Sequence, residues 1–210
     1  MDNFFNIESP VFEWISKIVD RMFLNVLFLV SSIPIITIGP ALAALYHVTG
    51  RIQRDEGSIW KDYWSAFCSN FKQATTIWLI LLVSGMLIGF SVLFYIQFSQ
   101  VNGIVALVLA VIGVFPWLAI AAWVFPLQAR FDNSISNTIK NALICGFLCF
   151  PRTLVATIIN FFPVVILLFA PGFFPFLVML WLIIGFSATA AINMTVFRKK
   201  IEELENMSRS

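Results

Sequence analysis

Long apolar runs alternate with short polar stretches along this chain, and the polar stretches are alternately basic and uncharged. Three of the stretches hold eleven of the thirteen Lys and Arg residues, and the other two gaps between apolar runs carry no charge. Because Lys and Arg are enriched in the cytoplasmic loops of membrane proteins, this alternation predicts several membrane crossings. The basic residues are Arg51, Arg54, Lys61 and Lys72; Arg130, Lys140 and Arg152; and Arg198, Lys199, Lys200 and Arg209.

The composition excludes a soluble globular domain. Hydrophobic residues make up 60% of the chain, charged residues 11%, and the mean hydropathy is +0.93, whereas soluble domains carry roughly 25% charged residues. A span needs about 20 mostly apolar residues, so a chain of 210 residues holds several crossings but no separate soluble domain. We predict one all-α integral membrane domain over residues 1–210, a polytopic helical bundle whose surroundings are the lipid bilayer.

The apolar runs predict about five transmembrane helices. The positive-inside rule then places the C-terminus in the cytoplasm and the N-terminus outside. The start of the chain lacks the basic, cleavable pattern of a signal peptide, so we expect it to persist in the mature protein. The expected spans are 22–48, 74–98, 104–129, 154–170 and 173–197.

A rival interpretation gives the N-terminus the opposite side. It takes residues 11–32 as the first helix and the segment after Pro40 as a second helix that crosses back. Four charged residues between positions 13 and 21 argue against it, because each costs about 2.5 to 3.5 kcal/mol near the bilayer centre. The five-span interpretation is therefore the leading one.

The first basic stretch contains an amphipathic helix. Over residues 58–71 the large apolar residues fall on one face at helical spacing, and Ser58 is placed to cap the start. Aromatic rings with polar tips, such as Trp60 and Trp64, suit the headgroup layer, so one interpretation lays this helix on the inner membrane surface. The other packs it against the bundle as a connector. The face consists of Ile59, Trp60, Tyr63, Trp64, Phe67 and Phe71.

The first two basic stretches also resemble each other. Ile59, Phe67 and Lys72 recur 80 positions later as Ile139, Phe147 and Arg152. The sequence therefore leaves open a direct repeat of about 80 residues, in which a span, a cytoplasmic helix and another span occur twice.

Helix-breaking and small residues mark two other places. Pro34 and the Gly39-Pro40 pair interrupt the first apolar run, and we expect them to kink the span, with Ser or Thr side chains replacing lost backbone bonds. Gly85 and Gly89 form a G-x-x-x-G step in the second span, which lets another helix approach closely.

No motif for catalysis, metal or cofactor binding stands out. The expected spans contain no Asp, Glu, Lys or Arg, and His47 is the single histidine of the chain. The three cysteines lie in or beside the basic stretches, where thiols stay reduced. We therefore expect no enzyme activity, no metal, no cofactor and no nucleic-acid partner. The polar residues within or near the spans either tie helices together or line a sugar-binding cavity: Asn25, Gln97, Gln128, Asn160 and Asn193.

Three short segments of the N-terminal third carry a family resemblance: 34–39 (PIITIG), 43–46 (AALY) and 69–74 (SNFKQA). On these segments the chain resembles the YesL-like family of bacterial integral membrane proteins. The resemblance implies a domain of unknown function of Gram-positive bacteria, often encoded beside genes for carbohydrate uptake and breakdown. It supplies no catalytic or binding residues.

These observations lead to one functional hypothesis and two alternatives. The leading hypothesis is a non-enzymatic accessory or regulatory component of carbohydrate uptake in the bacterial plasma membrane, with a transporter permease as its partner. The alternatives are a self-sufficient carrier or channel for a neutral solute and a protein that organises the membrane. The residues singled out as structural or interaction signatures are Pro34, Gly39, Pro40, Trp60, Trp64, Gly85 and Gly89. The sequence does not give the oligomeric state.

Overall fold

The computed structural model describes residues 10–98 and 103–209, and within these ranges it is helical and contains no β-strand. This confirms the prediction of an all-α polytopic fold. The first nine residues and the uncharged gap after residue 98 lie outside the described part of the chain. The elements are α1 (Pro10–Ser31), η1 (Ile35–Thr37), α2 (Ile38–Ile52), α3 (Ile59–Phe98), α4 (Gly103–Gln128), α5 (Ile135–Leu148), α6 (Phe150–Phe169), η2 (Pro171–Phe173), α7 (Phe174–Leu180), a π-helical segment η3 (Trp181–Gly185) and α8 (Phe186–Arg209).

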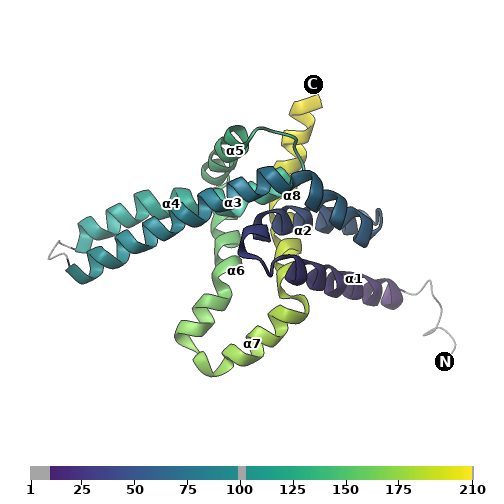
Figure 1. Cartoon of the computed structure of the whole chain (residues 1–210), viewed down its shortest axis with the longest axis horizontal. Coiled ribbons are helices and arrows are strands. Elements are labelled where there is room, and N and C mark those ends of the chain that lie inside the picture. The colour runs from purple at the N-terminus through teal and green to yellow at the C-terminus, as the bar shows by residue number, and fades with distance from the viewer. Residues whose placement is uncertain (1–9, 99–102, 210) are drawn as a thin grey trace.

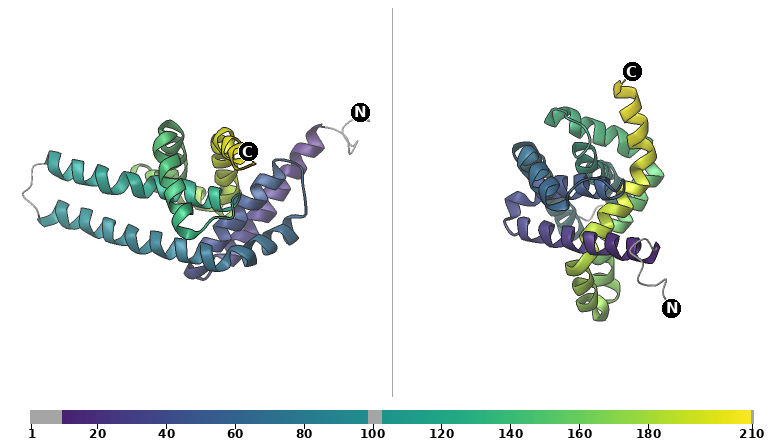
Figure 2. Two further views of the ribbon diagram at one scale, coloured as in Figure 1. Left: turned by 90° about the horizontal axis from the view of Figure 1, so that it is seen from above. Right: turned by 90° about the vertical axis from the view of Figure 1, so that its right-hand side faces the viewer.

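Two apolar hairpins leave a common centre in different directions. The hairpin of α3 and α4 extends to one side, and the hairpin of α6 and α7 extends at a steep angle to it (Figure 1). Helices α1 and α2 lie beside the first half of α3, on the other side of the centre, and α8 leads away from the centre to the C-terminus (Figures 1 and 2). The place where the two hairpins diverge is called the fork below.

Five helical stretches of the described chain are long and apolar enough to cross a membrane. Their number agrees with the sequence prediction, although their ends differ. In particular, the second stretch includes the amphipathic segment, and the last one includes the π-helical segment. They are Ile35–Ile52, Ile59–Tyr95, Val111–Gln128, Phe150–Phe169 and Pro171–Met207.

The first expected span, 22–48, is not one helix. Helix α1 ends at Ser31, and after a turn the chain continues as η1 and α2. The Thr37 hydroxyl donates to the carbonyl oxygens of Ser31 (2.6 Å) and Pro34 (2.7 Å), so it satisfies groups that the turn leaves without helical partners. Pro34 lies in the turn, as expected. The Gly39-Pro40 pair, by contrast, does not interrupt a helix, because it lies in the first turn of α2, where a missing N–H costs no helical bond.

The two ends of the described chain gather with the basic stretches. The ammonium group of Lys17 lies 3.0 Å from a carboxylate oxygen of Asp55, in the loop between α2 and α3. The guanidinium of Arg130 lies 3.5 Å from a carboxylate oxygen of Glu205, near the end of α8. Helix α1 thus runs away from the charged end and α2 returns to it, which is the course that the rival interpretation gives the chain. Helix α1 is not among the five stretches of the described chain able to cross a membrane, and the side of the membrane on which each end lies stays a prediction.

The core forms around α2, whose small residues allow close helix packing. Ala41, Ala43 and Ala44 are fully buried. A Cβ atom added at Gly39 would come within 2.7 Å of the Cβ of Trp78 and would also collide with the carbonyl oxygen of Ala74. Helix α2 therefore touches the backbone of α3 at this glycine.

The amphipathic segment 58–71 is not a separate helix on the membrane surface. It forms the first part of α3, which continues without a break for 40 residues, or about 60 Å. Tyr63 is fully buried, and its hydroxyl hydrogen-bonds with that of Ser31 at 2.5 Å. Of the two interpretations, the connector that packs against the bundle is the one observed. The backbone N–H of Ser58 donates to the carboxylate of Asp62 at 2.9 Å at the helix start.

The second basic stretch is built differently. Here α5 begins after Ser134, whose side chain accepts from the backbone N–H of Asn137, and ends before Cys149. A new helix, α6, then starts at Phe150. The connector and the following span are thus separate helices, whereas in α3 they are one. The direct repeat stays a prediction.

Candidate functional site

A cavity of about 200 Å³ lies at the fork, between α2, α3, α4 and α6. Each of these helices contributes to a stretch long enough to cross a membrane. Most of the lining is aromatic or aliphatic, and none of the lining residues is charged. The lining residues are Leu42, Tyr46, Trp78, Leu81, Trp117, Leu118, Ala121, Ala122, Phe125, Thr157, Asn160 and Phe161.

Three polar side chains from three helices meet beside this cavity. The side-chain amide of Asn193, on α8, is fully buried and donates to the Tyr46 hydroxyl and to the Oδ1 atom of Asn160, both at 3.0 Å. The Oδ1 atom of Asn193 is buried and has no hydrogen-bond partner. The network joins α2, α6 and α8 across the centre of the protein. Such an incompletely satisfied network is a natural place for a ligand.

Two tryptophans hold the wall of the cavity in place. The indole N–H of Trp78 donates to the Ile35 carbonyl at 2.8 Å, so it ties α3 to the start of the α2 region. The indole N–H of Trp117 donates to the Leu81 carbonyl at 3.1 Å and to the Ser84 hydroxyl at 3.2 Å. Because both N–H groups are used in helix packing, the rings present carbon surfaces to the cavity.

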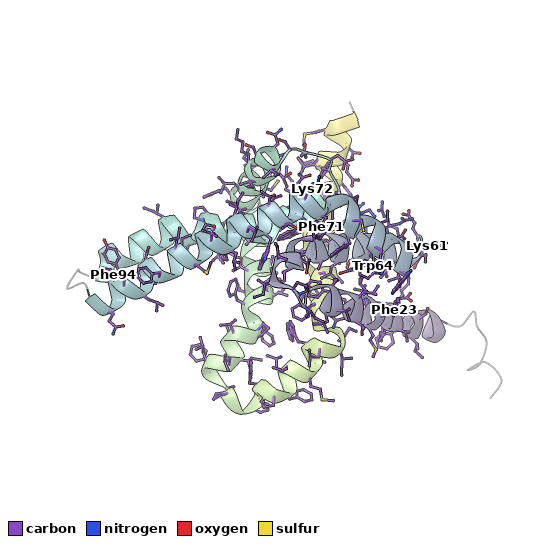
Figure 3. The ribbon with its side chains drawn as sticks, in the orientation of Figure 1. Phe23, Lys61, Trp64, Phe71, Lys72 and Phe94 are labelled. Atoms are coloured by element: carbon purple, nitrogen blue, oxygen red, sulfur yellow. The ribbon has the colours of Figure 1, made fainter. Side chains whose placement is uncertain are left out.

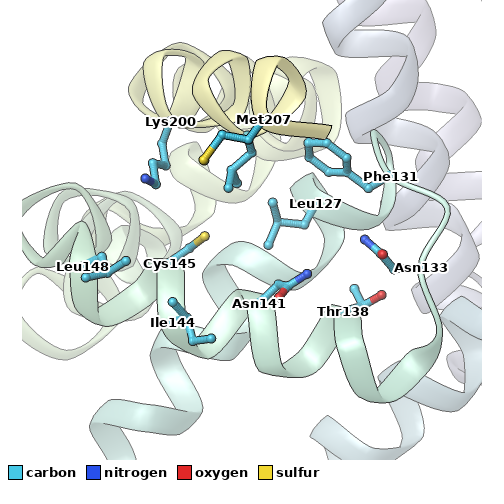
Figure 4. A pocket seen from close by; sticks show the side chains of 11 residues that line it. Leu127, Phe131, Asn133, Thr138, Asn141, Ile144, Cys145, Leu148, Lys200 and Met207 are labelled. Carbon is cyan, nitrogen blue, oxygen red and sulfur yellow. The ribbon is translucent and has the colours of Figure 1, made fainter. Parts of the chain in front are cut away.

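A second hollow, of about 360 Å³, lies between α5 and the end of α8 (Figure 4). Apolar side chains such as Leu127, Ile144 and Leu148 line most of it, with Asn133, Thr138 and Asn141 toward one end. Burial raises the pKa of the Cys145 thiol to about 11. The thiol is therefore protonated near neutral pH, which makes it a poor nucleophile and metal ligand.

Ion pairs close the charged end of the protein. Arg54, Arg130 and Arg198 line a small pocket there, and their carboxylate partners are Glu56 at 3.8 Å, Glu205 at 3.5 Å and Glu202 at 2.7 Å, respectively. Burial lowers the pKa of Arg130, and the charge of Arg54 lowers it further. The opposite charges balance, so this cluster is not a free cationic site. Of the three pairs, Arg130–Glu205 links the segment after α4 to α8, and the other two are local.

Asn25 accounts for the irregular start of α8. Its side-chain amide donates to the carbonyl oxygens of Trp181 (3.1 Å) and Leu182 (2.8 Å) in the π-helical segment. Its Oδ1 atom accepts from the backbone N–H of Ser187 at 3.0 Å. The expected role of a polar residue that ties helices together is thus confirmed for Asn25.

The signature residues predicted from the sequence do not form one site. Pro34, Gly39 and Pro40 lie at the turn between α1 and α2 and at the start of α2. Trp60 and Trp64 lie at the opposite end of that packing region and contact each other edge to face, with centroids 5.8 Å apart.

The ring of Phe23, on α1, lies 6.4 Å from that of Trp60. Figure 3 shows Trp64 and Phe71 along the first part of α3, between Lys61 and Lys72. The aromatic face thus packs toward α1 and α2. Only part of its length is therefore free to contact lipid headgroups.

The two glycines of the G-x-x-x-G step have different surroundings. A Cβ atom at Gly85 would come within 2.7 Å of the Trp117 indole, so this glycine packs α3 against α4. A Cβ atom at Gly89 would meet nothing within 4 Å, and the same holds for Gly113 on α4. The step therefore serves contact inside the chain at one position and is open at the other.

The sequence identifies Asn160 and Asn193 as polar residues within or near the spans, but it does not show that their side chains meet. The two lie 33 positions apart, and Tyr46 lies in another span. A polar residue in an apolar run was the available signal, and it does not say which residues meet. The described residues contain no group of three or more His, Cys, Asp or Glu side chains placed to hold a metal ion.

The fold and these sites define a multi-pass α-helical membrane protein whose polar groups lie at its centre and at one charged end. Residues 22–92 match the family model described as Protein of unknown function, DUF624. The match covers the three segments that carry the resemblance to the YesL-like family and is consistent with it. No curated protein and no solved structure matches the chain.

Proposed function

We propose that this protein is a non-enzymatic accessory or regulatory subunit of a carbohydrate-uptake system in the bacterial plasma membrane, with its C-terminus in the cytoplasm. The observation that carries the proposal is the hairpin of α3 and α4, which extends from the rest of the protein (Figure 1). Large apolar residues on both of its helices are exposed, including Met86, Phe90 and Ile112. Lipid or another membrane protein covers this surface in the bilayer.

The hairpin also offers positions for close contact with a partner helix. Gly89 and Gly113 each have open space where a side chain would be. Small residues at an exposed helix surface let a second transmembrane helix approach closely and pack well, which is the main source of helix association in lipid. The carbohydrate context of the proposal comes from the family resemblance, and the inside location of the C-terminus from the basic stretches.

Affinity capture tests the proposal. The full chain is extracted from its native membrane in mild detergent through a C-terminal tag, and the proteins that come with it are identified and quantified. We expect a transporter permease in near-equal amount. The protein alone in a defined oligomer would instead favour a self-sufficient carrier or channel for a neutral solute, and uptake into liposomes would then be measured.

Matched variants locate the contact. Replacing Gly89 or Gly113 by Leu blocks close approach of a partner helix, and neither position has a neighbour within 4 Å to disturb. Gly172, between α6 and α7, is equally open, so Gly172→Leu is the control. We expect the hairpin variants to lose the permease and the control to keep it. Equal recovery with all three variants would contradict a contact through this hairpin.

A further inference from the structure

The hydrogen bonds of Asn193 determine what the fork cavity offers to a ligand. Asn193 uses its side-chain N–H groups on Tyr46 and Asn160, and both of these residues act as acceptors in those bonds. The hydroxyl hydrogen of Tyr46 and the Nδ2 hydrogens of Asn160 are therefore left to donate elsewhere. Among the described residues, the Nδ2 atom of Asn160 makes no hydrogen bond. A ligand of this cavity has to supply acceptor atoms.

The position of Asn160 favours such a ligand. Asn160 lies midway along α6, in a stretch long and apolar enough to cross a membrane, and its side chain is exposed toward the cavity. An amide donor that faces acyl chains without an acceptor is costly, and a ligand that supplies an acceptor removes this cost.

The lining also limits the charge and shape of the ligand. None of the lining residues is charged, so a phosphate or carboxylate here would have no cation beside it and would lose its hydration without compensation. The rings of Trp78, Trp117 and Phe125 and several aliphatic side chains surround the polar groups. The ligand is therefore uncharged where it enters the cavity and largely apolar.

A sugar fits these conditions less well than an ester. A polyol brings several hydroxyl hydrogens, and each of them needs an acceptor. Only Tyr46, Thr157 and Asn160 supply side-chain oxygens to the lining, and the amide oxygen of Asn160 already accepts from Asn193. An ester group has acceptor oxygens and no hydrogen to donate, so it matches the free donors that Tyr46 and Asn160 present to the lining. The unpaired Oδ1 atom of Asn193 is fully buried and is not part of that lining.

From these contacts we infer that the fork cavity binds the ester region of an uncharged glycerolipid. The two hairpins diverge from the cavity (Figure 1), and exposed apolar side chains such as Ile80 on α3 and Ile158 on α6 lie along them. The cavity, at about 200 Å³, encloses the glycerol ester groups but not a whole lipid. The acyl chains extend between the hairpins. This inference does not depend on the proposed role in carbohydrate uptake.

Thermal unfolding of the purified full-length protein in detergent micelles tests the inference. The probes are dioleoylglycerol, phosphatidylglycerol with the same acyl chains, and glucose. At a hundredfold excess over its dissociation constant, dioleoylglycerol is expected to raise the unfolding midpoint by about 5–10 °C. Phosphatidylglycerol is expected to have a smaller effect, because its charge lacks a partner in the cavity, and glucose is expected to have none.

Two variants and one control make the result specific. Ala121→Phe places a ring in the cavity from α4, which carries none of the three polar residues of the network, and it is expected to abolish the dioleoylglycerol shift. Asn160→Leu removes the free donor and is expected to weaken binding about tenfold. Val19→Ile, at an exposed position on α1, which contributes nothing to the lining or to the two hairpins, is expected to behave like the unchanged protein. An equal dioleoylglycerol shift in Ala121→Phe and the unchanged protein, or a larger shift with glucose or phosphatidylglycerol, would overturn the inference.

Discussion

Replacing Gly39 by Ala is the most direct test of how α2 packs on α3. The added Cβ atom would lie 2.7 Å from the Cβ of Trp78 and 2.8 Å from the carbonyl carbon of Ala74, and it would collide with the Ala74 oxygen. Carbon atoms in contact normally lie about 3.5–4.0 Å apart, so the two helices have to separate by most of an ångström. Because the obstacle includes helical backbone, no side-chain rotation relieves it.

The cost follows from known overpacking effects. Inserting a methyl group into a well-packed core costs about 1–3 kcal/mol and occasionally more. A domain of this size loses roughly 2–4 °C of its unfolding midpoint per kcal/mol. We therefore expect Gly39→Ala to lower the midpoint by about 2–12 °C.

Two other glycines give a graded comparison in α3. At Gly85 the nearest atoms belong to the Trp117 side chain, which can shift at the expense of its hydrogen bonds to Leu81 and Ser84. We expect Gly85→Ala to change the midpoint by less than half as much as Gly39→Ala. Gly89 has open space around it, and alanine is better than glycine in a helix by up to about 1 kcal/mol. Gly89→Ala is therefore expected to be neutral or stabilising.

The assay measures the fraction of protein that stays folded and monodisperse in detergent after heating. Circular dichroism reports the folded fraction, and size-exclusion chromatography reports the monodisperse fraction. The expected order of stability is Gly89→Ala, the unchanged protein, Gly85→Ala and Gly39→Ala, from highest to lowest. A Gly39→Ala protein as stable as the unchanged one, or a Gly89→Ala protein as unstable as Gly39→Ala, would refute the packing of α2 on α3 described here.

Three further predictions concern other parts of the molecule. Asn25→Leu leaves backbone groups of the π-helical segment without partners and is expected to cost about 1–3 kcal/mol; an unchanged unfolding midpoint would count against this role. In an otherwise cysteine-free chain, Trp14→Cys and Met207→Cys are expected to react with an impermeant maleimide from the same side of the membrane, and labelling from opposite sides would exclude the hairpin of α1 and α2. Because burial raises the pKa of Cys145 to about 11, its thiolate is scarce below that pH. A chain that keeps only Cys145 should be alkylated slowly near neutral pH and faster as the pH rises toward 11, whereas a chain with only the exposed Cys68 should react readily; equal rates would contradict the burial.

Several features of the fold could be predicted because they depend on local composition. Apolar runs of sufficient length form helices in lipid, since the backbone groups have no other partners there. The uneven distribution of Lys and Arg similarly indicates which loops gather at one end. These local rules fail at residues 32–40, where the same Pro and Gly residues are compatible with a kinked span and with a turn between two helices.

The course of the chain at this turn depends on contacts made far away in the sequence. The bond from the Trp78 indole to the Ile35 carbonyl fixes the turn against α3, and the exposed pair of Lys17 and Asp55 lies at the other end of α1 and α2. The partners of these contacts lie 43 and 38 positions apart, respectively. No local pattern encodes such pairs, and the four charges between positions 13 and 21 favoured the other topology.

The sequence by itself determined that this is an all-α membrane protein with a basic end, because chain length, hydropathy and charge act locally and need no knowledge of packing. Only the tertiary structure decided that Gly85 is covered and Gly89 is open, and that Asn160, Asn193 and Tyr46 meet at the fork. Identical residue types acquired different roles because the free energy of a small or polar residue in lipid depends on which helix lies against it.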